Sequence, residues 1–138
     1  PLREWPELFV GRELFVRLDP GHGRGHHQHV RTAGTHSKFG VPLFELDELA
    51  RLARAAEARI IGLHAHVGSG VFAVDSWRET AEHLAAAAAV LGEVRILDVG
   101  GGLGVPDRPD RLPVDLAALD AALAELLVLV AARFHEDE

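Results

Sequence analysis

The sequence predicts an α/β fold with a parallel β-sheet, because short apolar runs alternate along the chain with helical patterns. Three runs have the length and the Val, Ile, Leu and Phe content of buried strands, at residues 13–18, 59–67 and 94–99. Connections are mostly short, apart from a long loop rich in Gly and His between Pro20 and Pro42. Strands and helices in this order favour a parallel sheet whose strands are joined through helices.

Three segments carry the periodicity and the end signals of amphipathic helices. In residues 44–58 the apolar side chains recur at helical spacing: Leu46, Leu49, Leu52, Ala53 and Ala56. In residues 75–92, Ser76 and Glu79 have the spacing of a capping box, and Gly92 stands where a helix would stop. In residues 115–134, Asp115 is placed to cap a helix with a broad apolar face.

Three strands make a thin sheet for this amount of helix. A closed (β/α)8 barrel has about 250 residues, and three βα units form a little under half of it. The 138 residues contain no evident repeat or linker, so 1–138 is expected to be one segment of an incomplete barrel domain. Such a segment implies missing strands and exposed sheet edges. The chain opens on Pro1 and has no Met, which suggests a processed chain or a piece of a larger one.

Charge and composition disfavour several classes of partner. The chain has 21 acidic and 14 basic residues and a net charge of -7, which argues against nucleic acid and anionic membrane surfaces. No apolar run approaches the roughly 20 residues that cross a bilayer, and no signal peptide is evident, so we expect a cytoplasmic protein. The absence of cysteine excludes disulfides and thiolate metal sites.

All three strand ends are rich in glycine and polar residues. The first expected strand is followed by DPGHGRGHHQH, the second ends in HVGSG, and the third is followed by GGGLG. Ligands of parallel α/β proteins gather at the carboxyl ends of the strands. The glycines at 100–104 bring backbone N–H groups close to such a ligand, and N–H groups in this arrangement suit a phosphate. The sequence therefore predicts an anion site at this edge of the sheet.

A metal site is one alternative for the second strand end. His64 and His66 share one face if the segment is a strand, because side chains alternate. A metal needs more ligands, and the preceding loop supplies candidates: His22, His26, His27, His29 and His36. We expect no carboxylate to complete a metal site with them, so we favour a packed or solvated role for these histidines.

A methyltransferase that uses S-adenosylmethionine is a second alternative, since LDVGGGLG resembles the glycine motif of that fold. That motif should run straight into a helix. Here Pro106, Pro109 and Pro113 delay the next helix to about residue 114. The acidic residue that should end a second strand about 20 residues later would fall within a helical pattern at 119–123. The methyltransferase is therefore the weaker interpretation.

Four motifs taken together resemble the alanine racemase-like pyridoxal phosphate barrels. They are FVRLDPG, SKFGVP, GLHAHVGSG and LDVGGGLG, in this order and spacing, and the likeness extends from about residue 14 to residue 127. The resemblance implies a partial (β/α)8 TIM barrel of about three βα units. The decarboxylase branch of this group acts on diaminopimelate, ornithine or arginine. Within it the chain is most similar to diaminopimelate decarboxylases, and the loop at 21–42 resembles the form fused to an aspartate kinase.

The resemblance implies a site for pyridoxal 5′-phosphate. His66 matches the histidine that stacks on the pyridine ring, and Ser69 matches the serine that contacts the cofactor phosphate. The family's glycine run, whose backbone N–H groups bind that phosphate, corresponds to Gly100, Gly101 and Gly102. Arg17 matches an arginine near the cofactor, and His64 is expected to be a side chain of the barrel interior without a ligand role.

The resemblance assigns none of the covalent chemistry to this chain. The lysine that forms the Schiff base lies on the first barrel strand of the family, and Lys38, the only lysine here, matches a different position. The acidic residue that faces the pyridine nitrogen belongs to an EPGR-like motif of the next strand, and the proton-donating cysteine to a later domain. We therefore expect a cofactor-binding segment with no catalytic residue and no metal, which does not decarboxylate an amino acid by itself.

The parent protein is expected to convert meso-diaminopimelate to L-lysine and CO2 in lysine biosynthesis. The resemblance further implies a small amino acid as substrate and a homodimer, with a possible fusion to aspartate kinase. Two alternatives stay open: an ornithine or arginine decarboxylase of the same fold, and a truncated product without catalytic activity. The flanking coding sequence would decide between a decarboxylase segment and a truncated product.

Overall fold

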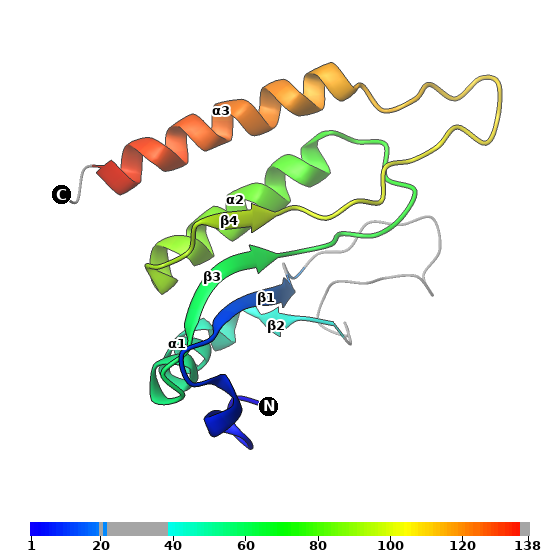
Figure 1. Cartoon of the computed structure of the whole chain (residues 1–138). Coiled ribbons are helices and arrows are strands. Elements are labelled where there is room, and N and C mark those ends of the chain that lie inside the picture. The colour runs from blue at the N-terminus through cyan, green and yellow to red at the C-terminus, as the bar shows by residue number, and fades with distance from the viewer. Residues whose placement is uncertain (20, 22–38, 136–138) are drawn as a thin grey trace.

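A computed structural model describes residues 1–19, 21 and 39–135 of the chain, and side chains as far as Val128 (Figure 1). Its helices and strands follow in the order η1 (Pro6–Phe9), β1 (Glu13–Asp19), β2 (Val41–Pro42), η3 (Leu43–Glu45), α1 (Leu46–Ala55), β3 (Arg59–His64), α2 (Asp75–Leu91), β4 (Ile96–Asp98) and α3 (Leu116–His135). Lys38 and the five histidines of the preceding loop lie outside the described residues.

The strands form one parallel sheet in the order β2-β1-β3-β4, which confirms the predicted α/β class. The two-residue strand β2 was not predicted, because a strand this short has no periodicity. It pairs with the end of β1, where Val41 lies opposite Leu18. A Cβ on Gly40 would lie 2.7 Å from the backbone of Leu18 and Asp19, so glycine permits this close approach.

An irregularity in the register between β1 and β3 decides which side chains face the helices. Leu14 pairs with Ile60, but the next residue, Phe15, pairs with Gly62. From there Arg17, His64 and Asp98 occupy register positions in neighbouring strands. Because alternate residues share a face, Phe15 and these three polar residues lie on one side of the sheet. That side is open: Phe15 is 52% exposed.

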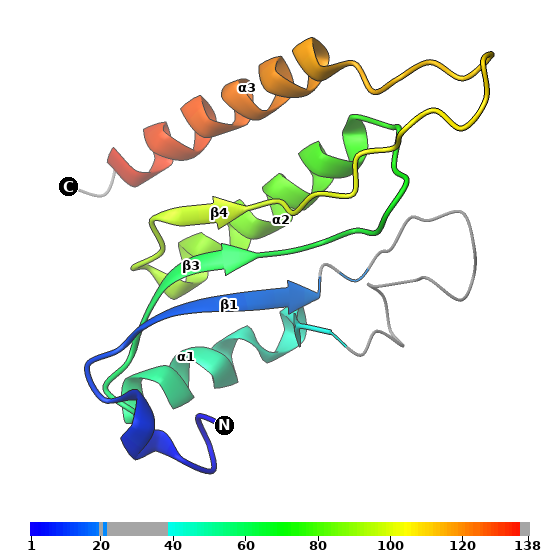
Figure 2. The ribbon, with the colours of Figure 1, turned by 45° about the vertical axis from the view of Figure 1, so that its right-hand side comes forward.

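The opposite side of the sheet carries the main core. Figure 2 shows α1 and α2 on this same side of the strands, and both helices contact β3. Buried residues of the strands, of the two helices and of the position just after β3 form a single cluster there: Leu18, Leu49, Ala53, Ile60, Leu63, Ala65, Leu84, Ala87 and Ala88. The alanines of α2 are short enough to let this helix lie close to the sheet.

The third helix begins where the proline-rich segment ends and packs along α2 (Figures 1 and 2). Its predicted cap is confirmed, because the Ala118 N–H donates to Oδ1 of Asp115 at 2.9 Å. Leu116, Leu127 and Val128 are exposed, so the apolar residues of this helix exceed what α2 covers. Among the described residues, no helix is long and apolar enough to cross a membrane.

The predicted capping box at the start of α2 is wrong. The helix begins at Asp75 after Val74, and no side chain caps it. Ser76 is buried in the first turn, and its hydroxyl makes no hydrogen bond in the structure. The predicted end of the helix is confirmed, because Gly92 follows the last residue with a φ of 84°.

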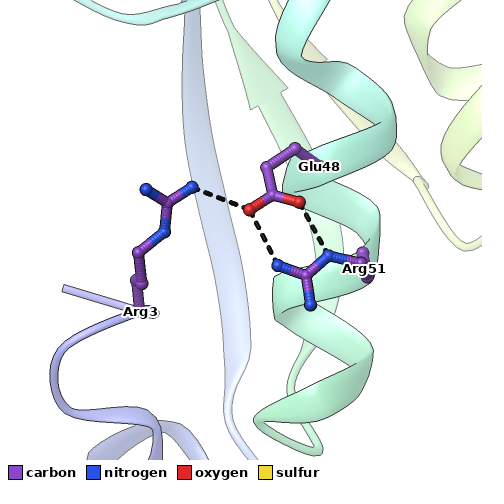
Figure 3. A network of polar contacts seen from close by, with 3 residues as sticks. All are labelled: Arg3, Glu48 and Arg51. Carbon is purple, nitrogen blue, oxygen red and sulfur yellow. Dashed lines mark hydrogen bonds and ion pairs between the residues drawn. The ribbon is translucent and has the colours of Figure 1, made fainter.

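The N-terminal segment is tied to α1 by a carboxylate with two arginines (Figure 3). Glu48 accepts from Arg51 at 2.7 Å and 2.8 Å, and from Arg3 at 2.7 Å. Hydrogen bonds from Arg51, and then from Arg3, lower the pKa of Glu48 to about 2. Because the network is exposed, we expect it to orient the N-terminal segment while contributing little to stability.

One residue of the turn between α1 and β3 gives a test of this backbone. Glu57 has a φ of 53° and is the only residue other than glycine, among those described, with a positive φ. The left-handed conformation costs a side chain about 1–2 kcal/mol, although glycine also loses more entropy on folding. We expect Glu57→Gly to raise the free energy of unfolding by about 0.5–1 kcal/mol.

The matched control is Glu57→Ala, which removes the exposed carboxylate but keeps the Cβ atom. We expect it to leave the free energy of unfolding within about 0.5 kcal/mol of the wild-type value. Urea unfolding of both variants checks the prediction. An equal gain in both would assign the effect to the carboxylate and refute backbone strain.

Candidate functional site

The loops that follow β3 and β4 run side by side at the carboxyl edge of the sheet (Figure 1). Parallel pairing continues past the strands, since the Ala65 N–H donates to the Asp98 carbonyl at 2.9 Å. Further out, Val71 donates to the Gly102 carbonyl at 2.9 Å and accepts from the Gly104 N–H at 2.7 Å. The two loops are therefore joined at both ends and form one surface.

The imidazole of His66 lies against the glycine run of the neighbouring loop. A Cβ on Gly100 would be 2.8 Å from Nδ1 of His66, and a Cβ on Gly102 would be 3.3 Å from Cε1. Gly100 and Gly102 also have φ values of 74° and 84°. Side chains at these two positions would displace the ring and strain the backbone, so the sequence needs glycine at both.

The three glycines differ in what surrounds them. A Cβ on Gly102 would overlap the carbonyl oxygen of Gly68, whereas a Cβ on Gly101 would meet nothing within 4 Å. Gly104, two residues further, faces the Phe72 ring so closely that a Cβ there would overlap it. The fixed points of this loop are therefore Gly100, Gly102 and Gly104, and Gly101 is the open one.

The hydrogen bonds of the glycine run leave two amides available. The Gly100 N–H donates to Oδ1 of Asp98 at 2.8 Å. The Gly101 carbonyl accepts from the indole Nε1 of Trp77 at 3.2 Å, and the Gly102 carbonyl accepts from Val71. Among the described residues, no acceptor is assigned to the N–H groups of Gly101 and Gly102. These two amides, rather than that of Gly100, are free to bind an anion.

Ser69 lies on the loop that faces this run. It stands between Gly68 and Gly70, whose φ values are 140° and 69°, and the residue is exposed. The observed strand β3 ends at His64, three residues before the predicted end at Val67, and the two glycines turn the chain after Val67. The turn places a serine hydroxyl on the same loop as His66, at the surface of the site.

Arg17, His64 and Asp98 form a polar row across β1, β3 and β4 beside His66. Arg17 also lies over the Phe39 ring, 5.0 Å from its centre. Burial lowers the pKa of His66, the positive Arg17 and His64 lower it further, and Asp98 opposes them. The shift favours an uncharged imidazole at neutral pH.

Trp77 and Asp98 were missed by the sequence analysis. Asp98 stands two residues before Gly100, the spacing at which an aspartate bonds to its own turn, and this signal was available. Trp77 is 1% exposed and comes from α2, far from the loop in sequence. Its polar N–H requires an acceptor when buried, but the sequence does not say which.

The structure gives no support for a metal site in the part of the chain it describes. No group of three His, Asp or Glu residues there is arranged to hold a metal ion. His64 and His66 lie in this part, whereas the five loop histidines considered as further ligands do not.

The contrast between Gly101 and Gly102 predicts a difference in tolerance. Gly102→Ala places a methyl group on the Gly68 carbonyl at a positive φ, so we expect the free energy of unfolding to fall by about 2 kcal/mol or more. Gly101→Ala adds a methyl group in open space, and we expect a loss below about 1 kcal/mol. Urea unfolding of the two variants checks this, and equal losses would contradict the described loop.

The environment of His66 predicts opposite responses to two substitutions. We expect its NMR titration midpoint below the ordinary value of 6.5. Arg17→Gln should raise the midpoint because it removes a repelling cation, and Asp98→Asn should lower it because it removes the attracting anion. Since the unfolded chain binds this proton more readily, stability should fall as the pH drops from 6.5 through the folded-state pKa. Shifts of equal sign in the two variants would refute the described row.

Comparisons with known proteins agree with this geometry. Residues 2–137 match the family model described as "Pyridoxal-dependent decarboxylase, pyridoxal binding domain". A diaminopimelate decarboxylase of Methanothermobacter thermautotrophicus is 37% identical over 113 residues, which are 77% of this chain and 26% of that protein. One from Streptomyces coelicolor is 33% identical over 122 residues, 85% of this chain and 28% of the relative.

The fold comparison gives the same result. A crystal structure of diaminopimelate decarboxylase superposes with a TM-score of 0.84 at 23% identity, and the match covers 97% of this chain and 32% of that one. The likeness supports the predicted partial (β/α)8 barrel, and the family match sets the methyltransferase aside. The chain spans about a quarter of the length of the relatives it matches. It belongs to the pyridoxal-dependent decarboxylases, in the part that the family model describes as the pyridoxal-binding domain.

Proposed function

We propose that this chain forms part of the pyridoxal 5′-phosphate site of an amino acid decarboxylase, which as a whole protein converts meso-diaminopimelate to L-lysine and CO2. The observation that carries the proposal is the position of His66 on a glycine run with two available amides, in a chain of this family. The pyridine ring of the cofactor would meet His66 there, and its phosphate would meet the two amides.

The described residues fit the phosphate end of this cofactor. The N–H groups of Gly101 and Gly102 are available, and the exposed hydroxyl of Ser69 lies on the facing loop. Backbone amides grouped in this way bind anions, and hydrogen bonds to a charged acceptor are stronger than neutral ones. We therefore assign the phosphate to these three donors.

His66 fits the pyridine ring. Its imidazole lies against Gly100 and Gly102, and the lowered pKa keeps it uncharged at neutral pH. An uncharged aromatic surface can stack on the ring without placing another cation beside Arg17. When bound, the cofactor supplies an electron sink for the carbanion left as CO2 departs. His66 would stack on the ring and orient it for that chemistry.

The substrate assignment follows the relatives. Proteins named diaminopimelate decarboxylase match this chain at 37% and 33% identity. A lysine decarboxylase of Selenomonas ruminantium shares the fold at 25% identity with a TM-score of 0.71, so the barrel alone does not select the substrate. We propose meso-diaminopimelate, with ornithine or arginine as the substrates to test against it. A homodimeric whole protein and a fused aspartate kinase remain predictions.

A segment graft tests the proposed activity. Residues 2–137 replace the matching segment of the Methanothermobacter thermautotrophicus relative, and CO2 release is measured with meso-diaminopimelate, ornithine and arginine. We expect cofactor-dependent release from meso-diaminopimelate, and none from the 138-residue chain alone. A graft that folds and binds no cofactor would refute the cofactor site, and a graft that binds the cofactor but releases no CO2 would refute the proposed activity.

Two serines of this chain provide a matched test of the phosphate contact. Ser69→Ala removes a hydroxyl proposed to bind the phosphate, so we expect the Kd for pyridoxal 5′-phosphate to rise about tenfold. Ser76→Ala removes a buried hydroxyl that has no hydrogen bond, and we expect the Kd to stay the same. Equilibrium dialysis of the chain measures both. Equal Kd values in the two variants would contradict the role of Ser69.

A further inference from the structure

We propose that Trp77 is a positioning residue that holds the glycine run in its phosphate-binding orientation from the helix layer below. The inference rests on the proposed function, because it explains how the phosphate donors are kept in place. Trp77 belongs to α2, is 1% exposed, and donates its indole N–H to the Gly101 carbonyl at 3.2 Å. Trp77 therefore acts on the site through Gly101 and does not line the site.

The argument depends on one peptide group. The Gly101 carbonyl and the Gly102 N–H belong to the same peptide unit, which is planar and trans, as no described bond is cis. In a trans unit the carbonyl and the N–H point in opposite directions. Because the carbonyl is directed to Trp77 in the interior, the N–H of Gly102 is directed away from it, toward the surface of the site.

The hydrogen bonds of the Gly100 N–H and the Gly102 carbonyl hold the loop on either side of this peptide, and among the described residues the bond from Trp77 is the one that holds the peptide itself. Glycine places few limits on the dihedral angles, and Gly101 has open space around its Cα atom. Rotation of the unit would turn the Gly102 amide away from an anion and leave the indole N–H buried without its acceptor. That loss opposes the rotation, so the hydrogen bond selects one orientation among several accessible ones.

The surroundings of Trp77 show that it supports both loops. It belongs to a second, smaller core with three other buried residues: Val67, Val71 and Val114. Val67 and Val71 come from the loop after β3, and Val114 precedes α3. Val99, which follows β4 and leads into the glycine run, packs against the same cluster. Trp77 is the member whose side chain bonds to the glycine run, whereas Val71 bonds to it through its backbone.

The hydrogen bond also polarises the donor. A carbonyl that accepts a hydrogen bond makes the N–H of its own peptide unit a better donor. In the sequence Trp77 N–H, Gly101 carbonyl, Gly102 N–H and phosphate, each bond strengthens the next. Phenylalanine can occupy much of the same volume but cannot begin this chain, which separates positioning from packing.

Trp77→Phe tests the proposal in the 138-residue chain. The readout is the ratio of the Kd for pyridoxal to the Kd for pyridoxal 5′-phosphate, which isolates the contribution of the phosphate group. We expect the Kd for pyridoxal 5′-phosphate to rise about three- to tenfold, and the Kd for pyridoxal to change less than about twofold. An unchanged ratio in a folded variant would overturn the proposal.

Two control variants separate this effect from packing and from indole loss in general. Val114→Ala loosens the same small core but keeps the indole, so we expect a lower Tm with an unchanged ratio. Trp5→Phe removes the other tryptophan, which is 51% exposed, and we expect neither Tm nor ratio to change. A Val114→Ala variant that lowers the ratio as much as Trp77→Phe would assign the effect to packing and overturn the proposal.

A second measurement keeps Trp77 and so does not depend on the folding of its variant. In Trp5→Phe a single indole N–H resonance remains, because the chain has two tryptophans. We expect pyridoxal 5′-phosphate to move this resonance downfield and pyridoxal to leave it in place. Equal responses to both compounds would overturn the role of Trp77. A wild-type chain with equal affinity for the two compounds would instead refute the phosphate site itself, and the positioning role with it.

Discussion

The absence of a side chain at Gly102 is the constraint on which the site depends. Its Cα lies so close to the Gly68 carbonyl that no Cβ fits, and its own carbonyl accepts from Val71. This contact holds the loops after β3 and β4 together beyond the carboxyl ends of the strands. His66 meets the glycine run only because the two loops approach in this way. The site is therefore a product of backbone packing, with few side chains involved.

Much of the site could be predicted because parallel strands end at one edge. That rule predicts that the loops carrying His66, Ser69 and the glycine run lie close together, even though about 30 residues separate them in sequence, whereas the cofactor roles of these residues came from the resemblance. The spacing of apolar residues along the chain predicted the main helices and strands. What failed locally was the capping box at Ser76, because a buried serine in the first turn has the same spacing as a cap.

Contacts between elements that are distant in the sequence could not be predicted from it. The bond from Trp77 to Gly101 joins a helix to a loop, and no local pattern announces its acceptor. The hydrogen bond from the Gly100 N–H to Asp98 is local and could be expected from the spacing. Its consequence, that the N–H groups of Gly101 and Gly102 are the ones available to an anion, required the structure. The short strand β2 likewise exists because Gly40 approaches Leu18, a contact that propensity does not encode.

The row of Arg17, His64 and Asp98 makes the open face of the sheet electrostatically asymmetric. A cation stands on β1 and an anion on β4, while the sheet backbone contributes little net dipole. The field between them runs across the strands, perpendicular to the chain direction. A planar group bound above His64 would experience a more positive potential on the side of β1 than on the side of β4. Its orientation would then be set by charge as well as by shape.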